Sequence, residues 1–213
     1  MLVDSSAIVA DLVSGGEAPE IHMMIGVGVV KESEAVLFQY IGNNQKATAL
    51  VTSNGKPLER LGNVKLLDVS IVKNIGTEKA TKLNVILELE KGNILVTSGI
   101  KSWWTTCVIT GLYGLLQNGL ISTPFNLDSY RGKTGRKPIF ATIRSGQMYS
   151  DRDLYAMLLA DRRSDTPEGW DSYELSITSI VETLKKALKA TPEPDTSFEA
   201  VEVQVAETAG EEF

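Results

Sequence analysis

Residues 102–127, SWWTTCVITGLYGLLQNGLISTPFNL, form a stretch without a single charged side chain, and the rest of the fold is organised around it. The continuously apolar part is shorter than the roughly 18 residues that a membrane-spanning helix requires, and threonine, glutamine and asparagine side chains interrupt it. We therefore predict a buried helix over 102–117 that crosses a sheet, and no membrane partner. Gly111 and Gly114 would allow another backbone to approach this helix closely.

The residues before this stretch carry the pattern of short strands. Asn54-Gly55 and Lys91-Gly92-Asn93 are turn signals between runs of alternating and β-branched residues. The expected strands are 21–30, 35–41, 47–52, 64–72, 82–90 and 94–98. Hairpin connections of this kind favour an antiparallel sheet. No strand, glycine-rich loop and helix follow one another as in nucleotide-binding folds.

The residues after the uncharged stretch predict one more strand, a helix, a second strand and a last helix. A helix should open at residues 150–153, residues 172–178 alternate strictly as in a half-buried strand, and Ser179 with Glu182 should open the last helix. We predict one α+β domain over residues 1–190. Its sheet is antiparallel and curved, or a partly open OB-like barrel with packed helices, and a disordered acidic tail follows over 191–213.

Charge is distributed unevenly along the chain. The 213 residues include 21 basic and 27 acidic side chains, for a net charge of −6. Residues 191–213 hold seven of the acids and no Lys or Arg, so the first 190 residues carry 21 basic and 20 acidic side chains. With two prolines and few large apolar residues, this tail cannot bury enough surface to offset the entropy of ordering. The bulk acidity therefore does not exclude a nucleic-acid partner for the body.

The basic residues of the body gather in residues 130–149, a segment without any acid. Sequence-tolerant binding of a single strand needs cations for phosphates and aromatic faces for bases. We expect a loop over 130–137 and a strand over 138–145. The predicted phosphate contacts are Arg131, Lys133, Arg136, Lys137 and Arg144, and the predicted stacking rings are Tyr130, Phe140 and Tyr149. Lys101, beside Trp103 and Trp104, adds a second contact point, at which one tryptophan faces the core and the other, assigned as Trp103, stacks.

The tail ends in Glu211, Glu212 and Phe213, and this ending resembles the acidic C-termini of bacterial and phage single-stranded DNA-binding proteins. The resemblance is confined to the tail. It implies a non-enzymatic single-stranded DNA-binding protein of replication, recombination or repair, cytoplasmic in a bacterium or encoded by a virus in a bacterial host. It also implies that the tail recruits replication or repair proteins and competes with DNA for the basic surface. RNA remains an alternative ligand, and we expect a homo-oligomer.

Two further functions stay open. His22 and Cys107 are the only residues of their types, which excludes an internal disulfide and a site built from several His or Cys ligands, so we expect no metal or cofactor. An oligomeric protein-interaction or structural accessory factor would use the uncharged helix and its glycines as an interface. A metal-dependent nuclease would use Asp68, Glu88 and Glu90. Glu88 and Glu90 share one face of a predicted strand, opposite the apolar residues, which is also the pattern of an ordinary solvated face.

Overall fold

A computed structural model describes residues 19–31, 33–41, 46–75, 80–133 and 137–190, and within these ranges the chain is an α+β domain. The strands are β1 (Ile21–Val27), β2 (Leu37–Ile41), β3 (Lys46–Ala49), β4 (Arg60–Ile75), β5 (Ala80–Leu89), β6 (Gly92–Gly99), β7 (Phe125–Arg131), β8 (Ile139–Ser145) and β9 (Gln147–Tyr149). The helices are α2 (Trp103–Gln117), α3 (Arg152–Ser164) and α4 (Pro167–Ala190). The tail, and with it the three terminal residues of the predicted recruitment motif, lies outside the described residues.

The strands form one nine-stranded sheet in the order β3-β2-β1-β6-β5-β4-β7-β8-β9, which has two ends and is not closed into a barrel. The expectation of a purely antiparallel sheet is wrong at one position, because β1 runs parallel to β6, with Met24 opposite Leu95. Parallel neighbours require a long connection, and here the whole of β2 to β5 lies between them. Local turn signals reveal hairpins, whereas this pairing joins strands about 70 residues apart in the sequence.

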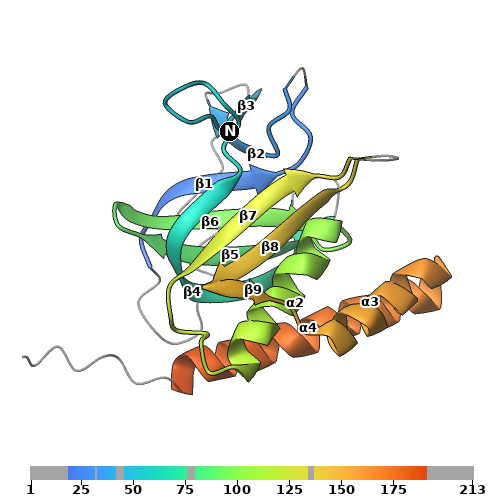
Figure 1. The fold of residues 1–213 in the computed structure, drawn as a ribbon. Coiled ribbons are helices and arrows are strands. Elements are labelled where there is room, and N and C mark those ends of the chain that lie inside the picture. The colour runs from blue at the N-terminus through green and yellow to red at the C-terminus, as the bar shows by residue number, and fades with distance from the viewer. Residues whose placement is uncertain (1–18, 32, 42–45, 76–79, 134–136, 191–213) are drawn as a thin grey trace, which may run out of the picture.

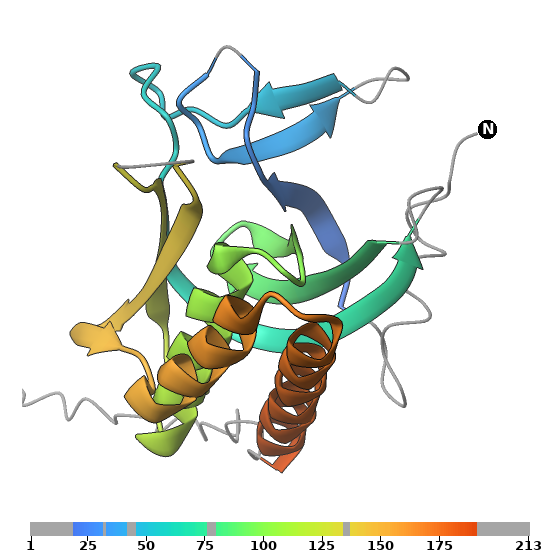
Figure 2. The ribbon, with the colours of Figure 1, turned by 90° about the vertical axis from the view of Figure 1, so that its right-hand side faces the viewer.

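The sheet curves around α2, with α3 and α4 on the same side (Figures 1 and 2). β4 links the two halves of the sheet, since it pairs with β7 near Arg60 and with β5 over the rest of its length. The register with β5 shifts between Leu66 and Asp68. Such irregularities bend a strand and increase its twist, which lets one long strand follow a strongly curved sheet.

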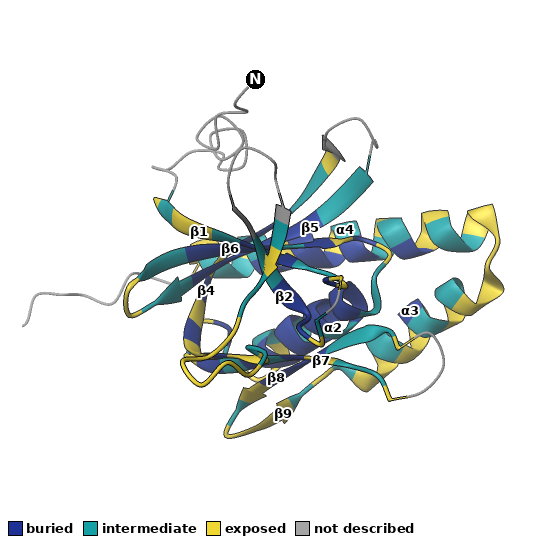
Figure 3. Cartoon of the chain, turned by 90° about the horizontal axis from the view of Figure 1, so that it is seen from above, coloured by how far each residue is buried: buried dark blue, intermediate teal, exposed yellow. Residues whose placement is uncertain are grey.

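α2 confirms the helix predicted for the uncharged stretch, and most of its surface is buried (Figure 3). Ser102 caps its first turn by accepting a hydrogen bond from the Thr105 N–H at 3.0 Å. A Cβ atom at Gly114 would lie 3.1 Å from the backbone nitrogen of Ser150, so the close approach predicted for this glycine is made within the chain. α2 is therefore packed mainly within its own domain, and its use as an oligomer interface stays a prediction.

The strand predicted over residues 172–178 is wrong, because these residues belong to α4. Tyr173, Ile177 and Leu184 are buried on one side of this helix, whereas Leu175 is 71% exposed. The strict alternation covers only seven residues, and the helical spacing of buried positions continues through the following two turns. The helix also begins earlier than predicted, after Thr166, whose hydroxyl accepts a hydrogen bond from the Gly169 N–H. Among the described residues, no helix is long and apolar enough to cross a membrane.

Candidate nucleic-acid interface

The strands β4, β7 and β8 turn one face toward the core and the other toward solvent. On β7 the alternation is strict: Phe125, Leu127 and Ser129 are buried, while Asp128 and Tyr130 point to the other face. β7 therefore starts within the uncharged stretch and contains the first two residues of the predicted loop, so the loop expectation is wrong for them. The strand predicted over 138–145 is confirmed as β8.

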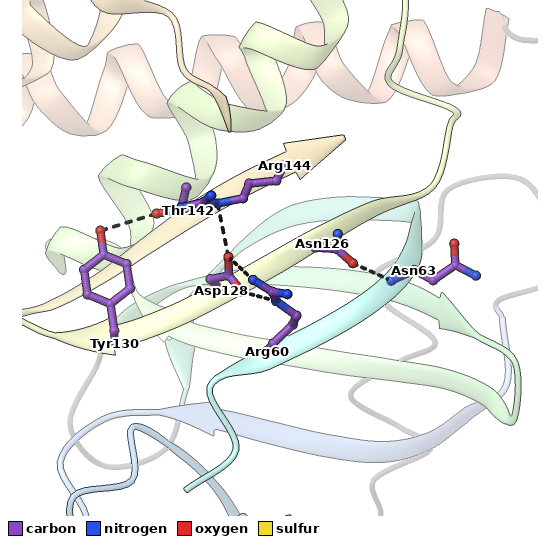
Figure 4. A network of polar contacts seen from close by, with 7 residues as sticks. All are labelled: Arg60, Asn63, Asn126, Asp128, Tyr130, Thr142 and Arg144. Carbon is purple, nitrogen blue, oxygen red and sulfur yellow. Dashed lines mark hydrogen bonds and ion pairs between the residues drawn. The ribbon is translucent and has the colours of Figure 1, made fainter. Parts of the chain in front are cut away.

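Two arginines share one carboxylate on this outer face (Figure 4). Arg60 on β4 and Arg144 on β8 both form ion pairs with Asp128 on β7, which lies between them. The arginine side chains are 60% and 53% exposed, and the carboxylate is 16% exposed. The hydrogen bond from Arg60 to Asp128 raises the pKa of this guanidinium, which keeps it charged. A pair of guanidiniums that shares one carboxylate retains a net positive charge and free N–H groups that suit phosphate.

Three aromatic rings lie in a row that includes the next residue of β7 on this face, Tyr130. Tyr130 and Phe140 are directly opposite each other on β7 and β8, with ring centroids 6.1 Å apart. The Trp103 ring, at the start of α2, lies 5.9 Å from the Phe140 ring. The Tyr130 hydroxyl accepts a hydrogen bond from the Thr142 hydroxyl, and the residue is 41% exposed. The structure thus brings together three of the predicted stacking residues, and we call them the aromatic row.

The two adjacent tryptophans have different roles. Trp104 is completely buried, and its indole N–H donates a hydrogen bond to the hydroxyl of Ser129 at 2.9 Å. Trp103 is half-buried, and its ring lies next to that of Phe140 in the aromatic row. Successive helical residues point about 100° apart, so one of the two had to face the core and the other to leave it.

The remaining predicted cations are divided between the hairpin tip and structural contacts. Lys133 and Lys137 are exposed between the end of β7 and the start of β8, while Arg136 lies outside the described residues. Arg131 instead holds the loop before β2, because its guanidinium donates to the backbone carbonyls of Ser33 and Ala35 at 2.9 and 3.4 Å. The Nη2 group of Arg131, for which we predicted a phosphate contact, is therefore engaged by backbone carbonyl groups.

Lys101 and Tyr149 lie apart from the outer face. Lys101 forms an ion pair with Glu174 of α4 at 3.2 Å. Tyr149 on β9 pairs with Ile143, so its side chain is on the same face of the sheet as that residue. This is the face that packs on α2, since a Cβ atom at Gly111 would lie 3.0 Å from the Ile143 side chain. Tyr149 is therefore on the opposite side from Tyr130.

The acids of the nuclease alternative do not converge. Asp68 forms an ion pair with Lys185 on α4, and Glu88 forms one with Lys65 on the neighbouring strand. Burial raises the pKa of Asp68, against the attraction of Lys185. Within the part of the chain that the structure describes, no group of three acidic, His or Cys side chains is arranged to hold a metal ion.

The single histidine and the single cysteine have surroundings that do not activate either side chain for catalysis. His22 is on β1, and its Nδ1 accepts a hydrogen bond from the backbone N–H of Asn93 at 3.3 Å. Burial raises the pKa of the Cys107 thiol, which keeps it protonated at neutral pH. Neither arrangement is that of an activated nucleophile and base.

A shallow cleft of about 430 Å³ lies between α3 and α4, away from the outer face of β4, β7 and β8. Leu154, Met157 and Ile180 line it together with Asp151 and Asp153. Two carboxylates at such a cleft repel a polyanion, so it does not extend the nucleic-acid interface.

Arg60 and Asp128 were missed by sequence reasoning. Arg60 stands among both acids and bases, which include Glu59, Lys65 and Asp68, so its segment is not basic. It reaches Asp128 only because β4 pairs with β7, 68 residues further along the chain. A weak signal existed in the segment 125–131, FNLDSYR, whose alternation of apolar and polar residues predicts a half-buried strand.

Comparison of the chain with models of protein families, with curated proteins and with solved structures gives no match.

Proposed function

We propose that this protein binds single-stranded DNA, without catalysing a reaction, through the outer face of β4, β7 and β8. The observation that supports the proposal best is that Tyr130 and Phe140 of the aromatic row share one face of the sheet with the exposed pair Arg60 and Arg144. Bases of any sequence stack on aromatic faces, whereas the phosphates between them need cations, and this face offers both within one rigid three-stranded unit.

The proposal includes a role for the acidic tail in replication, recombination or repair. Seven acids without a basic residue, tethered to the end of α4, can compete with DNA for the arginines and for the exposed lysines of the β7–β8 hairpin. Glu211, Glu212 and Phe213 would recruit partner proteins, as the resemblance of the tail implies. RNA is the second ligand to compare, since stacking and phosphate contacts alone do not distinguish the two sugars.

The test is a titration of the full chain with oligo-dT at roughly 50 mM salt, followed by tryptophan fluorescence and by anisotropy of a labelled oligonucleotide. We expect saturable binding whose affinity falls steeply with salt and increases when residues 191–213 are deleted. Oligo-U in the same assay compares RNA with DNA. If neither the full chain nor the shortened chain binds oligo-dT at this salt concentration, the proposal is wrong.

A double variant tests the face itself. Arg60→Ala with Arg144→Ala removes the arginine pair, and the slope of log K against log salt should become shallower by about 1.4, because each phosphate contact on a single strand contributes about 0.7. The matched control is Arg152→Ala with Lys186→Ala, which removes the same charge from exposed positions of α3 and α4. An equal effect of both double variants would mean that only the overall charge of the protein matters.

A further inference from the structure

Arg162, near the end of α3, is surrounded by aromatic rings. Its guanidinium carbon lies 4.2 Å from the centroid of the Trp103 ring, 5.3 Å from that of Trp170 and 5.5 Å from that of Tyr173. A guanidinium at these distances from aromatic faces is attracted by their quadrupoles, and the attraction grows as water is excluded. The rings come from α2 and α4, so a single side chain of α3 joins all three helices.

The same guanidinium also holds the backbone that leads into α2. Its Nη1 donates hydrogen bonds to the carbonyl oxygens of Lys101 at 2.7 Å and Ser102 at 3.5 Å, and its Nε is buried. No ion pair between Arg162 and a carboxylate is found in the described ranges. The charge of Arg162 is thus directed at rings and carbonyl groups rather than toward solvent, where a phosphate would bind.

Trp103 is the member of the aromatic row that contacts this cation, and it connects Arg162 to the other two rings. Arg162 stacks on its ring, and Phe140 contacts the same ring with centroids 5.9 Å apart. Arg162 contacts both the ring of Trp103 and the backbone just before it, and these contacts restrict the rotamers open to Trp103. Phe140 then packs against a ring that Arg162 holds on its other side, and Tyr130 packs against Phe140.

We propose that Arg162 is a positioning residue for single-strand binding, which orders the aromatic row through Trp103 and does not itself contact DNA. This inference rests on the proposed function. A row that is ordered before DNA arrives loses less side-chain entropy when bases stack on it, and the benefit is realised as affinity.

The experiment measures oligo-dT affinity and its salt dependence for the full chain carrying Arg162→Met, Arg162→Lys or the matched control Arg163→Met, whose position is adjacent and exposed. We expect Arg162→Met to weaken binding about three- to tenfold with an unchanged salt slope. Arg162→Lys keeps the charge but loses the planar stacking surface, so it should weaken binding similarly. Arg163→Met should change the affinity by less than about twofold. Far-ultraviolet circular dichroism identifies any variant that fails to fold, in which case the milder Arg162→Lys decides.

A double-mutant cycle with Trp103→Ala shows whether Arg162 acts through this ring. In the Trp103→Ala background, Arg162→Met should have no further effect, because the connection to Phe140 is already lost. Additive effects, a salt slope shallower by about 0.7, or full affinity in both Arg162 variants would overturn the inference while leaving the proposed function intact. Failure of the unmodified chain to bind oligo-dT would instead overturn the proposed function and this inference together.

Discussion

Tyr130 and Phe140 are directly opposite each other on β7 and β8, with ring centroids 6.1 Å apart, on the other face of the sheet from Ile143, which packs on α2. Asp128, two residues before Tyr130, is on the same face and forms ion pairs with Arg60 and Arg144. The pleat of β7 and β8 therefore places the two rings and the Asp128 carboxylate on one face, to which the neighbouring strand β4 adds Arg60.

Tyr130→Ala and Phe140→Ala should each weaken oligo-dT binding by about 1–3 kcal/mol, the usual contribution of a base stacked on an aromatic ring. Tyr149→Ala should leave the affinity unchanged, because Tyr149 is on the face that packs on α2. Fluorescence anisotropy with the full chain measures all three. A loss on Tyr149→Ala as large as on the other two would show that DNA follows a different face.

Asp128→Asn should strengthen oligo-dT binding, because phosphate no longer competes with a carboxylate for the two arginines. It should also lower the free energy of unfolding only slightly, because the two arginine side chains of these ion pairs are more than half exposed to water. Affinity and urea unfolding are measured on the same preparation, with Asp153→Asn on α3 as a control for the loss of one negative charge. Weaker binding would mean that Asp128 serves mainly to hold the arginines in place.

Ser129→Ala should lower the free energy of unfolding by about 1–3 kcal/mol, because the indole N–H of the completely buried Trp104 would lose its hydrogen-bond partner. Oligo-dT affinity should stay the same, since Ser129 faces the core. Urea denaturation followed by tryptophan fluorescence measures the stability, and Ser53→Ala, at an exposed position between β3 and β4, is the control. A variant as stable as the original chain would contradict this role.

Asp68→Asn should make the protein more stable at pH 7, with the gain shrinking as the pH is lowered. Burial raises the pKa of Asp68 in the folded state, so the folded protein holds a proton there more readily than the unfolded chain does. The contribution of Asp68 to stability is therefore complete below the ordinary carboxyl pKa and is lost as the pH rises through the raised folded value.

This difference is measured by urea unfolding of the original chain and of Asp68→Asn between about pH 3.5 and pH 7. The lower limit lies near the ordinary pKa of an aspartate carboxyl group. The exposed Asp171→Asn on α4 is the control and should show no such trend. A gain that stays constant over the whole pH range would mean that the Asp68 carboxylate does not titrate differently in the folded state.

The sequence by itself determined the features that depend on neighbouring residues. The uncharged stretch predicted α2 nearly to its ends, the turn signals located most strands of the first half, and the segment 130–149 contained Tyr130, Phe140 and Arg144. The position of charge along the chain likewise needs no structure. Each of these is a local property, because the face that an element buries is encoded in the periodicity of its own side chains.

Only the tertiary structure decided which residues share a surface. It placed Arg60 beside Asp128 across 68 residues, separated Tyr149 from Tyr130, committed Arg131 to backbone carbonyls and distinguished Trp103 from Trp104. It also showed that residues 172–178 are helical, because their contacts with α2 and β4 favour a longer period than seven residues reveal. Strand register and helix packing depend on residues far apart in the sequence, and no local pattern carries that information.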